Sequence, residues 1–118
     1  MPSKTSERSG PSSFEVVPFP FSDWHRSKRR PALVLSDARR FNIPAGPTVL
    51  ATITTAKPTQ WPLDIPLEEP SAAGLPQDSF VRMKLFTLDN RLILKWLGRS
   101  YESDRKRVQK ALRTLILS

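Results

Sequence analysis

A run of cations precedes an apolar segment of this chain. Four of the five residues from Arg26 to Arg30 are basic, and Pro31 and an apolar stretch follow at once. Guanidinium and ammonium groups bind phosphate oxygens, and a loop carried by a rigid strand is a usual place for such contacts. We therefore interpret this run as a phosphate-binding loop. Its composition also fits a loop that only aids solubility, or a run similar to a nuclear-localisation signal.

Three further side chains could take part in nucleic-acid chemistry. His25 is the only histidine and the one side chain expected to titrate near neutral pH, so it could act as a general base. Trp24 and Trp61 fall in expected loops, where an indole ring could stack on an unpaired base. Each also has a plainer interpretation: the histidine is an exposed loop residue without a role, and the tryptophans are partly buried in the core.

The overall composition favours a polyanionic partner. The 118 residues include 19 Lys and Arg against 11 Asp and Glu, a formal net charge of +8, so nucleic acid is the simplest expected partner. No cysteine and one histidine exclude disulfides, thiol catalysis and thiolate or multi-histidine metal sites. We expect no metal and no cofactor. With no signal peptide and no apolar run near about 20 residues, we expect a cytoplasmic protein without membrane association.

The prolines restrict where a long helix can form. All twelve lie between Pro2 and Pro76, and proline breaks helix interiors, so only residues 77–118 can hold one. An apolar stripe at helical spacing predicts an amphipathic helix at the end of the chain, with Ser103 as its N-cap. The residues of this stripe are Val108, Ala111, Leu112, Leu115 and Ile116.

The segments before this helix have the patterns of short strands and loops. We predict a disordered lead-in over residues 1–13 and one domain over residues 14–118. Expected strands are Phe14–Phe21, Pro31–Ser36, Pro47–Thr55, Leu63–Leu67, Ser79–Phe86 and Arg91–Leu97, with the basic loop Ser22–Arg30 between the first two. Many short strands followed by one helix predict a mainly β (α+β) fold, a small barrel with the amphipathic C-terminal helix packed on it.

Two segments carry a specific motif. The run Val17-Pro18-Phe19-Pro20-Phe21-Ser22-Asp23 is followed by Lys28-Arg29-Arg30-Pro31-Ala32-Leu33-Val34-Leu35-Ser36, and Ala51–Thr55 and Thr87–Leu92 add support. Over roughly residues 14–117 the chain resembles the MazF/PemK family, the toxins of type II toxin–antitoxin systems. The resemblance implies an SH3-like barrel, a homodimer and a metal-independent endoribonuclease. It also implies cleavage of single-stranded RNA, growth inhibition, and control by an acidic antitoxin protein.

The resemblance assigns roles to individual residues. The family's arginine before the proline of the second strand corresponds to Arg30, and its threonine or serine at the end of the third strand corresponds to Thr54. Metal-free RNA cleavage uses the ribose 2′-hydroxyl as nucleophile, so the protein must stabilise the charge that develops on the phosphate. Arg30 suits that task and Thr54 can donate a hydrogen bond to the same group. The expected RNA-binding residues are Trp24, His25, Lys28, Arg29, Thr55 and Asp78.

Two other functions stay open at this point. The chain could be a non-catalytic regulator that binds nucleic acid, including promoter DNA together with an antitoxin. Alternatively, it could be an SH3-like module with a degenerate active site, whose groove receives a peptide. A regulator would bind duplex DNA with steep salt dependence and cleave nothing, whereas a peptide module would be indifferent to the loss of Arg30.

Overall fold

The structure, a computed structural model, describes residues 15–22, 27–55, 61–93 and 95–117. The expected lead-in, Trp24 and His25 lie outside the described residues. The strands are β1 (Glu15–Ser22), β2 (Ser27–Val34), β3 (Pro47–Thr54), β4 (Ile65–Pro66), β5 (Phe80–Asp89) and β6 (Gly98–Arg99). The helical segments are η1 (Ala38–Asn42), α2 (Ile43–Ala45), η2 (Pro70–Ala73), η3 (Asn90–Leu92) and α3 (Glu102–Leu117).

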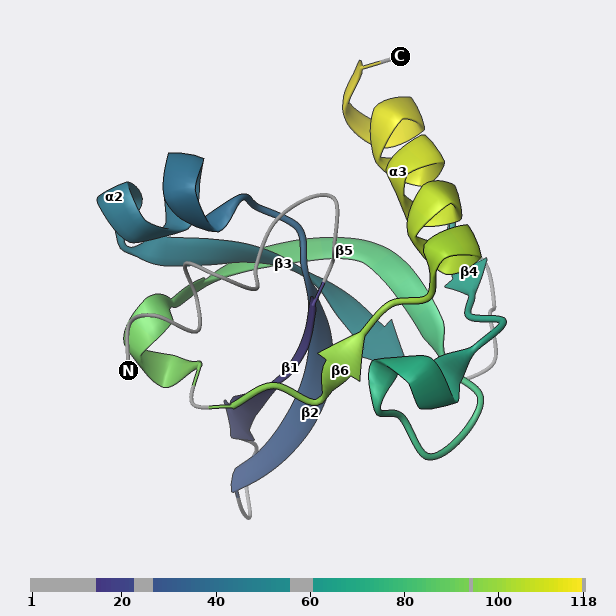
Figure 1. Ribbon diagram of the computed structural model, residues 1–118, viewed down its shortest axis with the longest axis horizontal. Helices are drawn as coiled ribbons and strands as arrows, with labels where there is room; N and C mark the ends of the chain where they lie inside the picture. Colours follow the sequence, from purple (N-terminus) through teal and green to yellow (C-terminus); the bar gives the residue numbers. More distant parts are fainter. Residues whose placement is uncertain (1–14, 23–26, 56–60, 94, 118) are drawn as a thin grey trace.

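The six strands form one antiparallel sheet in the order β4-β5-β3-β2-β1-β6. The sheet curls into a half-barrel, and α3 leans against it at the end of the chain (Figure 1). This architecture confirms the predicted mainly β, SH3-like fold with a terminal helix. It also agrees with the proline argument, because α3 is the one long helix in the described ranges and it follows Pro76.

The two faces of the sheet differ in what covers them. On the face that we call the helix face, Val16, Leu33, Ala51, Ile53 and Val81 belong to the core that includes Val108 and Ala111 of α3. On the opposite face, Val17, Ala32, Val34 and Leu50 form a second core with Phe86, Leu88, Ile93 and Trp96. Because side chains alternate along a strand, each strand residue can be assigned to one of these faces.

The basic segment differs from the prediction. We expected Ser22–Arg30 to be a loop, but β2 begins at Ser27 and its first residues pair with β1, so the cations from Lys28 to Arg30 lie on a strand. The prolines do not prevent this extension. Pro18 lies directly opposite Pro31, so two of the three missing N–H donors fall at one position of the ladder; the third is that of Pro20, opposite Arg29, and the pairing continues past both positions.

The connections around residues 37–46 and 87–97 also differ from the prediction. Asp37–Gly46, expected as turns, contains the helical segments η1 and α2, and the Asp37 carboxylate accepts hydrogen bonds from the backbone N–H groups of Arg39 and Arg40. Thr87–Asp89, expected as a connection, belongs to β5. The expected strand over 91–97 is absent from its described residues, because the Asp89 side chain accepts from the Arg91 N–H and begins the turn η3.

Helix α3 is confirmed, but its start and its exposed end differ from the prediction. It begins at Glu102, so Ser103 is in the first turn and its hydroxyl donates to Glu68 Oε1 at 3.0 Å. Val108 and Ala111 are buried as predicted, whereas Leu115 and Ile116 are 43% and 62% exposed. The apolar stripe therefore continues past the part of the sheet that can cover it.

Candidate nucleic-acid interface

The strand register relates Arg30 to Thr54. Ala32 pairs with Thr52, and Val34 with Leu50, in the antiparallel pair β2–β3. The pairing ends at Ala32 and Thr52, and two residues farther along the two strands lie Arg30 in β2 and Thr54 at the end of β3. Because side chains alternate along each strand, Arg30 and Thr54 lie on the opposite face, away from α3. Arg30 is exposed and Thr54 is partly exposed, so a ligand on this face can reach both positions.

Strand β5 adds two cations to the same face. Thr54 pairs with Phe80 and Thr52 with Arg82, whereas Ala51 pairs with Leu85, so a bulge in β5 holds two additional residues. The Thr52 hydroxyl donates to the backbone carbonyl of Lys84 at 2.9 Å and fixes this bulge. Since Val81 and Met83 belong to the helix-face core, the alternating Arg82 and Lys84 lie on the opposite face.

An exposed indole ring lies against these cations. The guanidinium of Arg82 lies 5.4 Å, and Nζ of Lys84 5.8 Å, from the centroid of the Trp61 ring. Such distances are within the range of cation–π attraction. Trp61 is 41% exposed. We call Trp61, Asp64, Arg82 and Lys84 the tryptophan cluster.

Asp64 anchors the cluster. Its carboxylate accepts from Arg82 Nη2 at 2.8 Å and from Arg82 Nε at 3.2 Å, and its side chain is only 5% exposed. The hydrogen bond from Arg82 to Asp64 raises the pKa of Arg82, and partial desolvation opposes this increase. Arg82 is thus a fixed positive charge, whereas the exposed Lys84 extends from the bulge.

The other nominated residues are placed around this end of the sheet. Thr55 directly follows β3 and is exposed, and Asp78 is exposed two residues before β5, whose first residue pairs with Thr54. Lys28 and Arg29 lie on β2, where they pair with Phe21 and Pro20 of β1. Trp24 and His25 lie outside the described residues. The expected pair Arg30 and Thr54 therefore shares a face, while the relation of His25 to that pair stays a prediction.

Sequence reasoning missed two members of this face. Arg82 and Lys84 were not predicted as site residues, although they are two residues apart on one strand and both carry positive charge. The bulge that presents them depends on pairing between β3 and β5, which a local pattern does not reveal. For Trp61 the sequence left two interpretations open, base stacking and core burial, and the exposed ring makes the first one possible.

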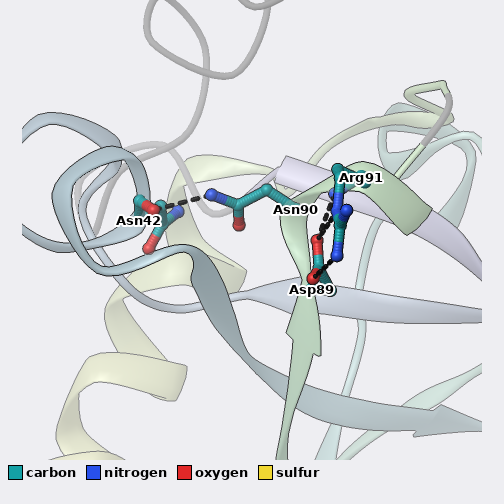
Figure 2. Close-up of polar contacts among 4 residues, drawn as sticks. All are labelled: Asn42, Asp89, Asn90 and Arg91. Carbon is teal, nitrogen blue, oxygen red and sulfur yellow. Dashed lines mark hydrogen bonds and ion pairs between the residues drawn. The ribbon is translucent and has the colours of Figure 1, made fainter.

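Near the start of β3, hydrogen bonds of Asn90 join this strand to the end of η1. The Asn90 side-chain amide donates to the carbonyl oxygen of the buried Asn42 at 2.6 Å (Figure 2), and the Thr48 hydroxyl donates to Asn90 Oδ1 at 2.5 Å. The neighbouring Asp89 and Arg91 form an exposed ion pair of 2.9 Å. The hydrogen bonds from the Arg91 side chain and backbone lower the pKa of Asp89 to about 2. These contacts bind η1 to η3 and have no evident chemistry toward a ligand.

No helix in the described ranges is long and apolar enough to cross a membrane. No group of three or more His, Cys, Asp or Glu side chains in them could hold a metal ion.

A curled antiparallel sheet, a C-terminal helix and a basic sheet face are the features expected of a toxin from a type II toxin–antitoxin system. The family model described as the PemK-like, MazF-like toxin of type II toxin–antitoxin systems matches residues 13–116. The chain therefore belongs to this family, and the resemblance seen in its motifs is confirmed. Among curated proteins, no match to the chain was found.

Solved structures of related toxins show the same fold. The chain is similar to MazE–MazF from Deinococcus radiodurans, with a TM-score of 0.70 and 23% identity, over 90% of this chain and 95% of that chain. For MazF alone from the same organism the TM-score is 0.66 and the identity 24%, over 92% and 98% of the two chains. For an endoribonuclease in complex with its cognate antitoxin from a mycobacterial species, the values are 0.66 and 22%, over 85% and 88%.

Proposed function

We propose that this protein is the toxin component of a type II toxin–antitoxin system and acts in the cytoplasm as a metal-independent endoribonuclease on single-stranded RNA. The observation that carries the proposal is that Arg30 and Thr54 lie on adjacent strands, each two residues beyond the Ala32–Thr52 pair and on the face away from α3. An arginine is charged at every physiological pH and matches two phosphate oxygens at once. A threonine hydroxyl opposite it can donate to the same phosphate.

The proposed reaction is an internal transfer within the RNA. The ribose 2′-oxygen attacks the adjacent phosphorus as its proton leaves to a base, for which His25 is the candidate from the sequence. The bond from phosphorus to the 5′-oxygen breaks, and that oxygen takes up a proton. The products are a 2′,3′-cyclic phosphate and a 5′-hydroxyl. Arg30 stabilises the extra negative charge at phosphorus, which is where a fixed donor accelerates such a step most.

The remaining nominated residues bind the RNA in this proposal. Lys28 and Arg29 contact phosphates, while Thr55, Asp78 and Trp24 contact sugars and bases near the cut. Cation–phosphate contacts set register and orientation rather than sequence. The choice of cleavage sequence then depends on the polar and aromatic groups around Thr54.

We further propose that an acidic antitoxin protein covers this face and stops cleavage. The exposed cations support a negatively charged partner, and complementary charge favours fast and selective association. Two of the similar structures are named as a MazE–MazF assembly and as an endoribonuclease with its cognate antitoxin. Bound to the antitoxin, the protein would also take part in binding promoter DNA.

We also propose that the protein is a homodimer. An apolar groove of about 330 Å³ lies between the end of α3 and the sheet, lined by Leu35, Val49, Leu85, Leu112, Ile116 and Leu117 among others. The exposed apolar residues Leu115, Ile116 and Leu117 lie at the same helix end. A second copy related by a two-fold axis presents the same groove and the same apolar side chains, as an interface of this symmetry requires.

The test measures RNA cleavage in EDTA together with growth on induced expression. The wild type should cut single-stranded RNA and stop growth, and Arg30→Ala should lower the cleavage rate about 100-fold or more and restore growth. Arg39→Ala is a matched control, because Arg39 is also exposed but lies on η1, beyond the start of β3. If the wild type leaves RNA uncut but binds duplex DNA, the non-catalytic regulator is the better assignment.

A further inference from the structure

Trp61 is an exposed aromatic ring held by fixed charges. The Asp64 carboxylate holds the Arg82 guanidinium with hydrogen bonds of 2.8 and 3.2 Å, and that guanidinium lies 5.4 Å from the ring centroid. The indole is therefore supported by a group that is itself anchored to a nearly buried carboxylate. Much of the ring still faces solvent, because Trp61 is 41% exposed.

The cluster lies beside the proposed cleavage position. Arg82 pairs with Thr52, which is two residues from Thr54 on the same strand and the same face. Diagonal neighbours across adjacent strands are roughly 7–8 Å apart, which is close to the spacing of successive nucleotides. The ring lies beyond Arg82, so a base one or two nucleotides from a phosphate held at Arg30 and Thr54 can reach it.

We propose that Trp61 stacks on a base of single-stranded RNA one or two nucleotides from the cut, and that Lys84 contacts the adjoining phosphate. The inference rests on the RNA-binding part of the proposed function and adds to it a base-binding subsite. An exposed aromatic ring next to lysine and arginine is the combination that binds unpaired nucleotides, since the base stacks and the cations meet the backbone. Arg82 keeps its place on Asp64, whereas the long, exposed side chain of Lys84 is free to turn from the ring to a phosphate.

An acidic segment of an antitoxin is the other partner that these charges would attract. A carboxylate would pair with Lys84, but it gains nothing from the π-face of the indole, which is electron-rich. The neutral face of a base does gain from it. The aromatic character of residue 61 therefore distinguishes the two partners, and the test is built on it.

The experiment measures binding to a single-stranded RNA whose 2′-hydroxyls are methylated, so that it cannot be cleaved. The second probe is the same ribose–phosphate chain without bases, and the third is a short peptide rich in Glu and Leu. Trp61→Leu should weaken binding of the intact RNA roughly tenfold, the usual size of one lost base stack, and Trp61→Phe should restore most of it. Neither variant should change the affinity for the chain without bases.

Two further variants sharpen the result. Lys84→Ala should lower the slope of log affinity against log salt by about 0.7, the value for one lost phosphate contact on a single strand, whereas Trp61→Leu should leave the slope unchanged. Phe41→Leu is the matched control, because Phe41 is 40% exposed and adjoins Arg40, but lies on η1 near the other end of β3. Its affinity for RNA should equal that of the wild type.

The proposed stacking subsite is wrong if Trp61→Leu binds intact RNA as tightly as the wild type does. It is also wrong if this variant loses affinity for the ribose–phosphate chain without bases by the same factor as for intact RNA. If Trp61→Leu loses affinity only for the Glu- and Leu-rich peptide, the proposal is also overturned, and the ring is assigned to a protein partner. Because the probe cannot be cleaved, these outcomes do not depend on catalysis. A wild type that cuts no RNA in EDTA, but needs Trp61 for binding, would refute the proposed ribonuclease and keep the subsite.

Discussion

The Asp64 carboxylate holds the Arg82 guanidinium through Nε and Nη2 at the point where β5 bulges away from β3. Asp64→Asn removes the charge that makes this contact strong, so we expect a lower Tm and weaker RNA binding, because Arg82 no longer has a fixed position under Trp61. Thermal unfolding and RNA affinity measure the two effects.

Asp89→Asn is the control for this change. It removes the carboxylate of another Asp–Arg pair, but one in which the Arg91 side chain is 89% exposed and the Asp89 side chain 44% exposed. Exposed pairs contribute little to stability, and asparagine can still begin the turn η3. Equal losses in Tm for the two variants would contradict an anchoring role for Asp64.

A buried carboxylate fastens the loop before η2 to α3. Asp104 is fully buried, accepts the backbone N–H groups of Glu68 and Glu69 at 2.8 and 3.1 Å, and pairs with Arg107. Asp104→Ala leaves these donors without an acceptor, so we expect a loss of about 2 kcal/mol in the free energy of unfolding. Urea denaturation measures it.

Glu102→Gln tests whether the loss in the free energy of unfolding is particular to the buried Asp104. The Glu102 carboxylate pairs with Lys106 at 3.5 Å on the exposed side of the same helix. This variant should stay within about 0.5 kcal/mol of the wild type. A larger loss for Glu102→Gln than for Asp104→Ala would contradict the assignment.

The pair of Asp89 and Arg91 predicts a small pH effect with a definite sign. Hydrogen bonds from Arg91 lower the pKa of Asp89 from 3.8 to about 2 in the folded protein. A lowered folded-state pKa contributes stability above the unfolded-state value, and this contribution is lost as pH falls toward the folded-state value. The Tm advantage of the wild type over Asp89→Asn should therefore shrink between about pH 4 and pH 2. An advantage that grows over this range would contradict the pKa direction.

The exposed end of α3 predicts the oligomeric state. Ile116→Glu places a charge at the rim of the apolar groove, where a second copy would have to bury it. We expect sedimentation to show a dimer for the wild type and a folded monomer for this variant. A wild type that sediments as a monomer at all concentrations would refute the proposed dimer.

Much of the fold was predictable because its signals are local. The β-branched run of β3 and the apolar stripe of α3 can be read within one segment, and the proline distribution leaves only one place for a long helix. Arg30 and Thr54 were found through the motif, and their relation follows from the register of β2 and β3. What failed depends on distant pairing. Ser27–Arg30 became a strand because it pairs with Phe19–Ser22 of β1, and Leu115 and Ile116 stayed exposed because the sheet leaves the end of α3 largely uncovered.

In the candidate site, too, features with a local signal were predictable and features that depend on distant strand pairing were not. The positive charge and a tryptophan in an expected loop are visible in the sequence, but the exposure of Trp61 and its combination with Arg82 and Lys84 are not, since they depend on the bulge opposite Ala51 and Thr52. The structural role of Asp104 was also hidden. It lies in the first turn of α3, where its sequence position gives no sign that it is an acceptor for a loop that is distant in sequence.

The most direct test of the central claim is the rate of metal-free RNA cleavage in a double-mutant cycle of Arg30 and Thr54. In EDTA, the wild type should release 2′,3′-cyclic phosphate ends. Arg30→Ala should be slower by about 100-fold or more, and Thr54→Val roughly tenfold slower, as for one lost hydrogen bond. If both groups bind one phosphate, the double variant should be little slower than Arg30→Ala alone. A wild type that cuts nothing in EDTA, or an Arg30→Ala variant that cuts at the wild-type rate, would contradict the account.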